Sequence, residues 1–221
     1  MSGSILRRLI LKDLYLMRPL MLGALIVGGI GIAVMPLGET AFFLGWLVLF
    51  IAVVLLGVFT TAALVIGERK DKVHLFVMTL PTSPAQYTAA KLAASTTAFL
   101  VPSAILAVSA LTLIAATGIP DALMAFLAAL LLYAVCYYAA YLAVALVTDS
   151  VIWATLVIII GNTAPVFIIP ALARLPEMSP EVASGPIWSG RVLAILAAEA
   201  AFSAAVIGLA LYIRSRQRDL V

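Results

Sequence analysis

Residues 41–67 read AFFLGWLVLFIAVVLLGVFTTAALVIG and contain no charged side chain. A helix of this length extends for about 40 Å, which exceeds the ~30 Å of hydrocarbon in a bilayer. This stretch therefore predicts a membrane-spanning helix. Other runs of comparable length and character cover 19–38, 92–120, 122–148 and 150–173, and 192–213 is interrupted only by Glu199.

The whole chain has the composition of a membrane protein. Of its 221 residues 65% are hydrophobic and 10% are charged, and its mean hydropathy is +1.23. A soluble domain carries about 25% charged residues, so a water-soluble globule is excluded. Because the apolar runs are continuous and not alternating segments of about ten residues, a transmembrane β-barrel is excluded as well. We expect an all-α, polytopic membrane protein with six transmembrane helices, each satisfying its own backbone hydrogen bonds.

The chain, residues 1–221, is predicted to form a single transmembrane domain. Residues 4–18 mix apolar and charged side chains, which is typical of an interfacial helix with its charges toward water. That helix is either an elbow that touches a cytoplasmic partner or an anchor that fixes topology. The spans are predicted at about 19–36, 41–67, 84–117, 121–148, 150–173 and 190–213, with a cytoplasmic loop at 68–83 and an extracytoplasmic loop at 174–189.

The basic residues predict the orientation. If the N-terminus is cytoplasmic, only Arg174 and Arg191 of the 13 Lys and Arg residues fall outside. Basic residues are concentrated in cytoplasmic segments of membrane proteins, so both termini are expected to be cytoplasmic. The net charge of +3 then requires no nucleic-acid partner, because the basic residues lie where anionic lipid of the inner leaflet would attract them.

The segment that follows residues 41–67 is the most informative part of the chain. A dense charge cluster at 68–72 precedes an apolar stretch at 73–80, which contains His74 and is too short to span. Pro81 ends this stretch, and Ser83 is a candidate N-cap for the third span. The pattern predicts a short amphipathic cytoplasmic helix. Its apolar side docks either in a protein groove or on the bilayer surface.

Two ionisable side chains fall inside predicted spans. Lys91 lies about two turns into the third span and is expected to extend toward the inner headgroups. Counted from Arg191 at about 1.5 Å per residue, Glu199 lies about 12 Å into the membrane. An ionised acid at this depth is costly unless it is paired or hydrated. Glu199 either lines a substrate or proton path or is a protonated or hydrogen-bonded packing group.

Tyrosines form a stripe on the fourth span. Steps of four residues place Tyr133, Tyr137 and Tyr141 on one helical face. The stripe either lines a pathway or packs between helices.

Prolines are concentrated near the outer end of the fifth span. Five of the chain's 11 prolines lie between Pro165 and Pro186. Because proline removes a backbone donor, this region predicts a broken or re-entrant outer element, which is either an outer gate or a plain connection.

The sequence lacks the motifs of common catalytic sites. It has no Gly-Lys-Ser/Thr phosphate loop and no Gly-x-Ser-x-Gly turn. The single histidine, His74, has no second histidine for a metal pair, and the single cysteine, Cys136, excludes an intrachain disulfide. We therefore predict a non-catalytic chain without a metal site or a cofactor of its own.

The order of these features resembles the membrane subunit of a type-2 ATP-binding-cassette (ABC) exporter, a family of small bacterial permeases with six spans. The likeness covers the whole chain. The residues that carry it are Leu11-Lys12-Asp13-Leu14 before the first span, Glu68, Leu75, Leu80-Pro81, Ser83 and Lys91 around the cytoplasmic loop, and Tyr212, Ser215, Arg218 and Asp219 near the C-terminus.

The resemblance implies that the loop at 68–83 is a coupling helix, seated in a groove of a separate ATPase subunit. It further implies two such ATPases, which hold ATP and Mg, and a second permease subunit in a homodimer or related heterodimer. The expected location is the bacterial cytoplasmic (inner) membrane. The coupling role would fall on Glu68, Arg69, Lys70, His74, Leu75, Phe76, Leu80, Pro81 and Ser83.

The predicted function is thus a permease subunit that exports a hydrophobic or amphipathic substrate, driven by ATP hydrolysis on its partner. One alternative is a secondary transporter that uses Glu199 and the broken fifth span as a midplane ion site, although no inverted repeat is visible. Another is a membrane scaffold or immunity protein that moves nothing.

Overall fold

The computed structural model describes residues 2–67, 84–148, 150–179 and 188–216. In these ranges every regular element is helical, and six helices are long and apolar enough to cross a membrane, which confirms the predicted fold class. The α-helices are α1 (Ser2–Val34), α2 (Glu39–Thr61), α5 (Pro84–Ala116), α6 (Ala122–Val147), α7 (Val151–Thr163), α8 (Pro165–Ala173) and α9 (Gly190–Arg216). α7 and α8 together make the fifth span. The short elements are η1 (Met35–Leu37), the π-helical η2 (Ala62–Gly67) and η3 (Pro176–Met178).

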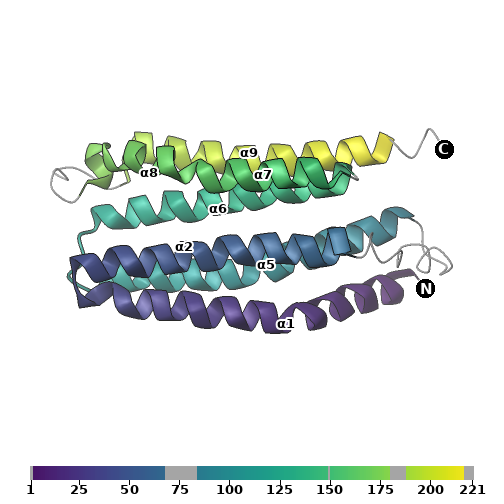
Figure 1. Ribbon diagram of the computed structural model, residues 1–221, viewed down its shortest axis with the longest axis horizontal. Helices are drawn as coiled ribbons and strands as arrows, with labels where there is room; N and C mark the ends of the chain where they lie inside the picture. Colours follow the sequence, from purple (N-terminus) through teal and green to yellow (C-terminus); the bar gives the residue numbers. More distant parts are fainter. Residues whose placement is uncertain (1, 68–83, 149, 180–187, 217–221) are drawn as a thin grey trace.

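The helices lie lengthwise beside one another in two groups (Figure 1). α1 packs most extensively on α2 and α5, while α6 packs most extensively on α9. α6 also contacts α2, α5 and α7, so it joins the two groups. The first turn of α1 and the last turn of α9 lie at the same end of the bundle, which is the end where η2 finishes and α5 begins.

α1 joins the predicted interfacial segment and the first span in one helix. It continues from Ser2 through Pro19 to Val34, so the chain has no helix end at the boundary predicted between residues 18 and 19. Pro19 lacks a backbone N–H, and Figure 1 shows a change of direction part-way along α1. The orientation predicted for its charges is wrong at Asp13, because that side chain is buried.

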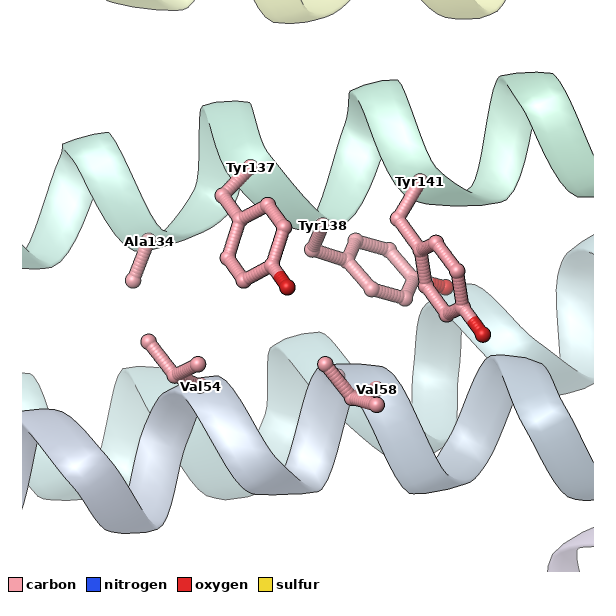
Figure 2. A pocket seen from close by; sticks show the side chains of 7 residues that line it. Val54, Val58, Ala134, Tyr137, Tyr138 and Tyr141 are labelled. Carbon is pink, nitrogen blue, oxygen red and sulfur yellow. The ribbon is translucent and has the colours of Figure 1, made fainter. Parts of the chain in front are cut away.

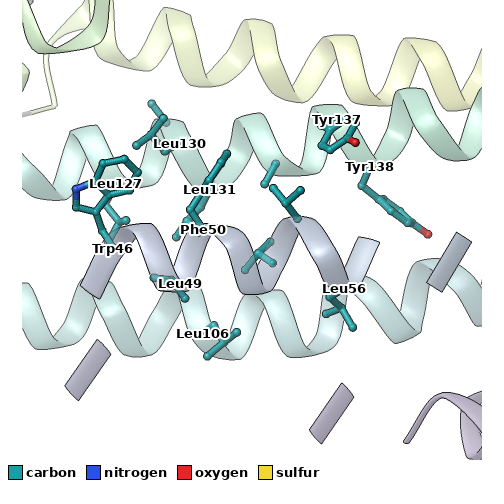
Figure 3. Packing of buried hydrophobic residues seen from close by; sticks show 14 of the residues in the cluster. Trp46, Leu49, Phe50, Leu56, Leu106, Leu127, Leu130, Leu131, Tyr137 and Tyr138 are labelled. Atoms are coloured by element: carbon teal, nitrogen blue, oxygen red, sulfur yellow. The ribbon is translucent and has the colours of Figure 1, made fainter. Parts of the chain in front are cut away.

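The hydrophobic core lies between α2 and α6 (Figure 3). In their most apolar stretches, 56% of α2 with η2 and 67% of α6 is buried, compared with 11% for α7 with α8 and 11% for α9. Trp46 on α2 meets Phe126 on α6 edge to face, with ring centroids 5.9 Å apart. The fifth and sixth spans therefore present most of their surface to their surroundings.

α1 and α2 approach closely at two glycines. A Cβ atom on Gly31 would lie 2.6 Å from the carbonyl oxygen of Gly45, and a Cβ on Gly45 would in turn overlap the carbonyl oxygen of Gly31. Small residues at facing positions allow this contact between backbones. The turn that reverses the chain between the helices contains Gly38, whose φ of 142° is one that side-chain-bearing residues rarely adopt.

The fifth span is interrupted, as predicted, but the interruption is a single residue. α7 ends at Thr163 and α8 starts at Pro165, with Ala164 between them in a right-handed helical conformation. Residues 152–173 therefore form one candidate span, and the described part of this element is not re-entrant.

Candidate functional site

The predicted coupling residues, Glu68 to Ser83, lie outside the described residues, so the structure describes only the helices on either side of them. η2 ends at Gly67, and α5 begins at Pro84. η2 is a π-helix, a form that often marks functional sites. The candidate site is therefore the group of helices next to this segment, which we call the base: α1, η2 and the first part of α5.

A buried ion pair fastens α5 to α1 at this base. Lys91 Nζ lies 2.6 Å from Asp13 Oδ2, and the two side chains are 7% and 1% exposed. Lys12, which is exposed, adds a second contact of 3.3 Å between its Nζ and Asp13 Oδ1. The prediction that Lys91 extends toward the headgroups is wrong, because the nearby carboxylate offers a closer partner for its charge.

A small apolar cluster continues the same contact along the bundle. Met17 on α1, Leu64 on η2, and Ala94 and Ala98 on α5 are all buried together. The alanines recur every four residues, which lets α5 lie close against α1. The chain is thus held to α1 both just before the coupling segment and just after it.

The sequence contained a signal for the buried acid. Asp13 falls on the same helical stripe as Ile10, Leu14 and Met17, all of which face the cluster. A carboxylate on an apolar stripe needs a buried partner. Nothing in the sequence identified Lys91 as that partner, since the two residues lie on helices that meet only in the folded chain.

The predicted tyrosine stripe lies between α6 and its neighbours. Figure 2 shows Tyr137 and Tyr141 directed toward Val54 and Val58 on α2. The space between these side chains is too small to hold a water molecule. Within the described protomer these side chains are therefore packed, and a pathway role for Tyr133, Tyr137 and Tyr141 remains a prediction.

Glu199 lies on α9 where this helix packs against α6. Its carbonyl oxygen accepts hydrogen bonds from Cys136 Sγ at 3.1 Å and from Ser203 Oγ at 2.9 Å. One carboxylate oxygen is buried without a hydrogen-bond partner among the described residues. No hydrogen bond in the described ranges joins the Glu199 carboxylate to the tyrosines, so the structure does not bring these predicted pathway groups together.

The outer end of the bundle carries a smaller polar group. Ser189 Oγ donates to Glu177 Oε1 at 3.1 Å and accepts from the backbone N–H of Val192 at 3.3 Å, which caps α9. A hydrogen bond from its own backbone N–H holds the pKa of Glu177 below its ordinary value, and Ser189 and the charge of Arg191 act in the same direction. This cluster ties η3 to α9.

Comparison with known proteins gives a family match across nearly the whole chain. Residues 8–215 match the family described as "ABC-2 family transporter protein". No curated protein and no solved structure matches the chain. The matched range includes Asp13, Lys91 and the segment between η2 and α5.

Proposed function

Because the chain belongs to the ABC-2 transporter family, and is thus a multi-pass ABC permease, we propose that it is the membrane subunit of an exporter. Its substrate is hydrophobic or amphipathic, and the energy comes from ATP hydrolysed on separate ATPase subunits. ATP and Mg are held by those subunits, and this chain contributes no catalytic residue. The alternatives of an uncoupled scaffold or immunity protein predict no flux.

The packing of the two helices that flank residues 68–83 in the sequence supports the proposal. A displacement of this segment would act on η2 and α5 directly, because these helices are joined to its two ends. Leu64 on η2 packs with Met17, and Lys91 on α5 pairs with Asp13, so α1 would follow. A loop that served only as a connection would not require an ion pair excluded from solvent, since burying charge is costly unless both partners are present.

The packing suggests how such a displacement would reach the rest of the bundle. α1, α2 and α5 form one group, and α6, α7 and α9 form the other. The two groups meet at the apolar core between α2 and α6 and at the contact of α5 with α6, where a buried hydrogen bond of 2.9 Å joins Ser95 Oγ and Tyr138 Oη. We expect the first group to tilt against the second when the ATPases close.

The proposed arrangement in the membrane has both termini in the cytoplasm of a bacterial cell, in the inner membrane. Exposed basic residues support it, because they lie in the half of α1 that begins at Ser2 and in the last turn of α9: Arg7, Arg8, Lys12, Arg18 and Arg216. Arg18 lies over the ring of Tyr15 at 4.8 Å and Arg216 over that of Tyr212 at 5.2 Å, as expected at a headgroup boundary.

A disruption of the coupling segment tests the ATPase partnership. The chain is purified from membranes with the ATPase encoded nearby, as wild type, Phe76→Asp and the matched control Phe76→Leu. We expect Phe76→Asp to lose both copurification and stimulation of ATP hydrolysis at least tenfold, because a charge cannot enter an apolar groove. Phe76→Leu should retain both. An intact, stimulated complex with Phe76→Asp would make the coupling role wrong.

The buried carboxylate of Glu199 favours one second candidate, a secondary transporter driven by an ion or proton. Under that function Glu199→Gln abolishes transport in vesicles that contain no ATPase. Under the proposed function those vesicles transport nothing, with or without the substitution. The two functions are thus separated by one assay on the same preparation.

A further inference from the structure

The interruption of the fifth span leaves a specific backbone group without its helical partner. Pro165 has no N–H, so the carbonyl oxygen of Gly161, four residues earlier, receives no helical hydrogen bond from it. The helix is otherwise resumed at once, because Ala164 N–H donates to Ile160 O at 2.9 Å and Ile168 N–H donates to Ala164 O at 3.0 Å. A carbonyl without a donor is costly in hydrocarbon, where no water can replace the missing bond.

A side chain from another helix supplies that bond. Tyr133 Oη on α6 donates to the carbonyl oxygen of Gly161 at 2.6 Å. The ring of Tyr133 is stacked with that of Phe50 on α2, with centroids 6.3 Å apart, which places the hydroxyl. The donor thus meets the carbonyl that the proline leaves free.

The residues next to the break fit the same arrangement. A Cβ on Gly161 would overlap the ring of Tyr137, so only glycine lets α7 lie this close to α6. Asn162 Nδ2 donates to Ile158 O at 2.9 Å and to Tyr137 Oη at 3.3 Å. Two tyrosines of α6 therefore meet the last turn of α7 just before the break.

We propose that the fifth span is a clasped hinge. Pro165 creates the pivot at Ala164, and Tyr133 is the positioning residue that supplies the withheld hydrogen bond and holds the last turn of α7 against α6. When Tyr133 releases Gly161, the last turn of α7 loses this tie to α6, and α8 can turn against α7 at Ala164. The inference concerns this chain alone and does not depend on the proposed function, on the partner ATPase or on the direction of transport.

The carbonyl of Gly161 can be observed directly in the full chain reconstituted in lipid bilayers. Asn162 is the only asparagine in the sequence. Labelling glycine with ¹³C at the carbonyl and asparagine with ¹⁵N therefore selects the single Gly161–Asn162 peptide bond in solid-state NMR. We expect Tyr133→Phe to move the Gly161 carbonyl shift upfield, because its hydrogen bond is lost. An unchanged shift in Tyr133→Phe would overturn the proposal.

A double-mutant cycle tests whether proline and tyrosine act together. Pro165→Ala restores an N–H that can donate to Gly161, so Tyr133→Phe should have little effect in that background, on the carbonyl shift and on Tm alike. In the native background Tyr133→Phe should lower Tm by about 2–4 °C. Tyr141→Phe is the matched control, since the structure gives no hydrogen bond for that hydroxyl in the described residues. Equal effects of Tyr133→Phe in both backgrounds would contradict the clasp.

Discussion

Asp13 shows how one side chain can decide the packing of a whole helix end. Its side chain is 1% exposed, and one carboxylate oxygen lies 2.6 Å from Lys91 Nζ. Lys91 is on α5, which follows α1 in the sequence only after α2 and η2. Each of these two charges offsets part of the cost of burying the other. The pair therefore specifies which faces of α1 and α5 meet, while the alanines on α5 only permit the approach.

Removal of either partner should destabilise the protein, because the other loses its closest charged contact, which is excluded from solvent. We expect Asp13→Leu or Lys91→Met to lower the free energy of unfolding by about 1.5–3 kcal/mol. The double variant Asp13→Leu with Lys91→Met should be more stable than either single variant, since apolar pairs replace buried ion pairs at little cost. Thermal unfolding in detergent measures all three. A double variant that loses the sum of the two single effects would show that the pair is not coupled.

The outer cluster around Glu177 predicts a pH dependence. Its pKa is lowered in the folded chain, chiefly by its own backbone N–H, so the stability it contributes is present above the unfolded pKa of about 4.5 and is lost as pH falls through the folded value. Between about pH 5 and pH 3, Tm should fall further for the wild type than for Glu177→Gln. Parallel Tm curves for the two proteins would place the acid response elsewhere.

At the scale of the element, close backbone contact and proline placement determine how the helices fit. α1 and α2 meet through Gly31 and Gly45, and the fifth span turns on Pro165. Neither feature depends on hydrophobicity, which is nearly uniform along the uncharged runs 19–38, 41–67 and 150–173 that contain these residues. The uniformity makes the positions of the small residues decisive.

The glycine contact between α1 and α2 predicts contrasting effects for two similar substitutions. Gly45→Ala should lower the free energy of unfolding by about 1–3 kcal/mol, because its Cβ would meet the Gly31 carbonyl and Met35. Gly23→Ala on α1 is the control. No atom lies within 4 Å of its added Cβ, so it should leave stability unchanged or raise it through helix propensity. Thermal unfolding of both variants decides, and equal losses would contradict the close contact.

The sequence predicted the six spans because uncharged runs of this length have one stable form in a bilayer. It did not predict that α1 passes through Pro19, since the charges at residues 7–18 suggested a change of environment and the lost backbone bond costs too little to end a packed helix. The burial of Asp13 could have been predicted from its position on an apolar helical stripe. The bond from Tyr133 to Gly161 could not, because it depends on which face of α6 meets α7.

The whole molecule is packed unevenly. The most apolar stretches of α7 with α8 and of α9 are only 11% buried, and the exposed surface of the fifth span includes the polar side chains of Asn162 and Thr163. Polar groups of a span usually face protein or a wet cavity. The proposed second permease subunit would cover this face.

A cysteine crosslinking experiment tests where the second subunit binds. Ile160 on α7 is 66% exposed and Ile26 on α1 is 63% exposed, so the two positions are matched in accessibility. In membranes Ile160→Cys should form a covalent dimer several-fold more than Ile26→Cys, and the native Cys136 is buried and should not interfere. Preferential dimer formation through residue 26 would place the partner on α1 instead.

The buried ion pair also bears on how the chain is made. Asp13 leaves the ribosome 78 residues before Lys91, so the nascent chain carries this acid without its buried partner while the first two spans are already complete. The insertion machinery must hold the beginning of α1 in a wet or protein-lined site until α5 arrives. Chains that stop before residue 91 would keep an exposed acid on an apolar helix, a mark by which membrane quality control could recognise them as unfinished.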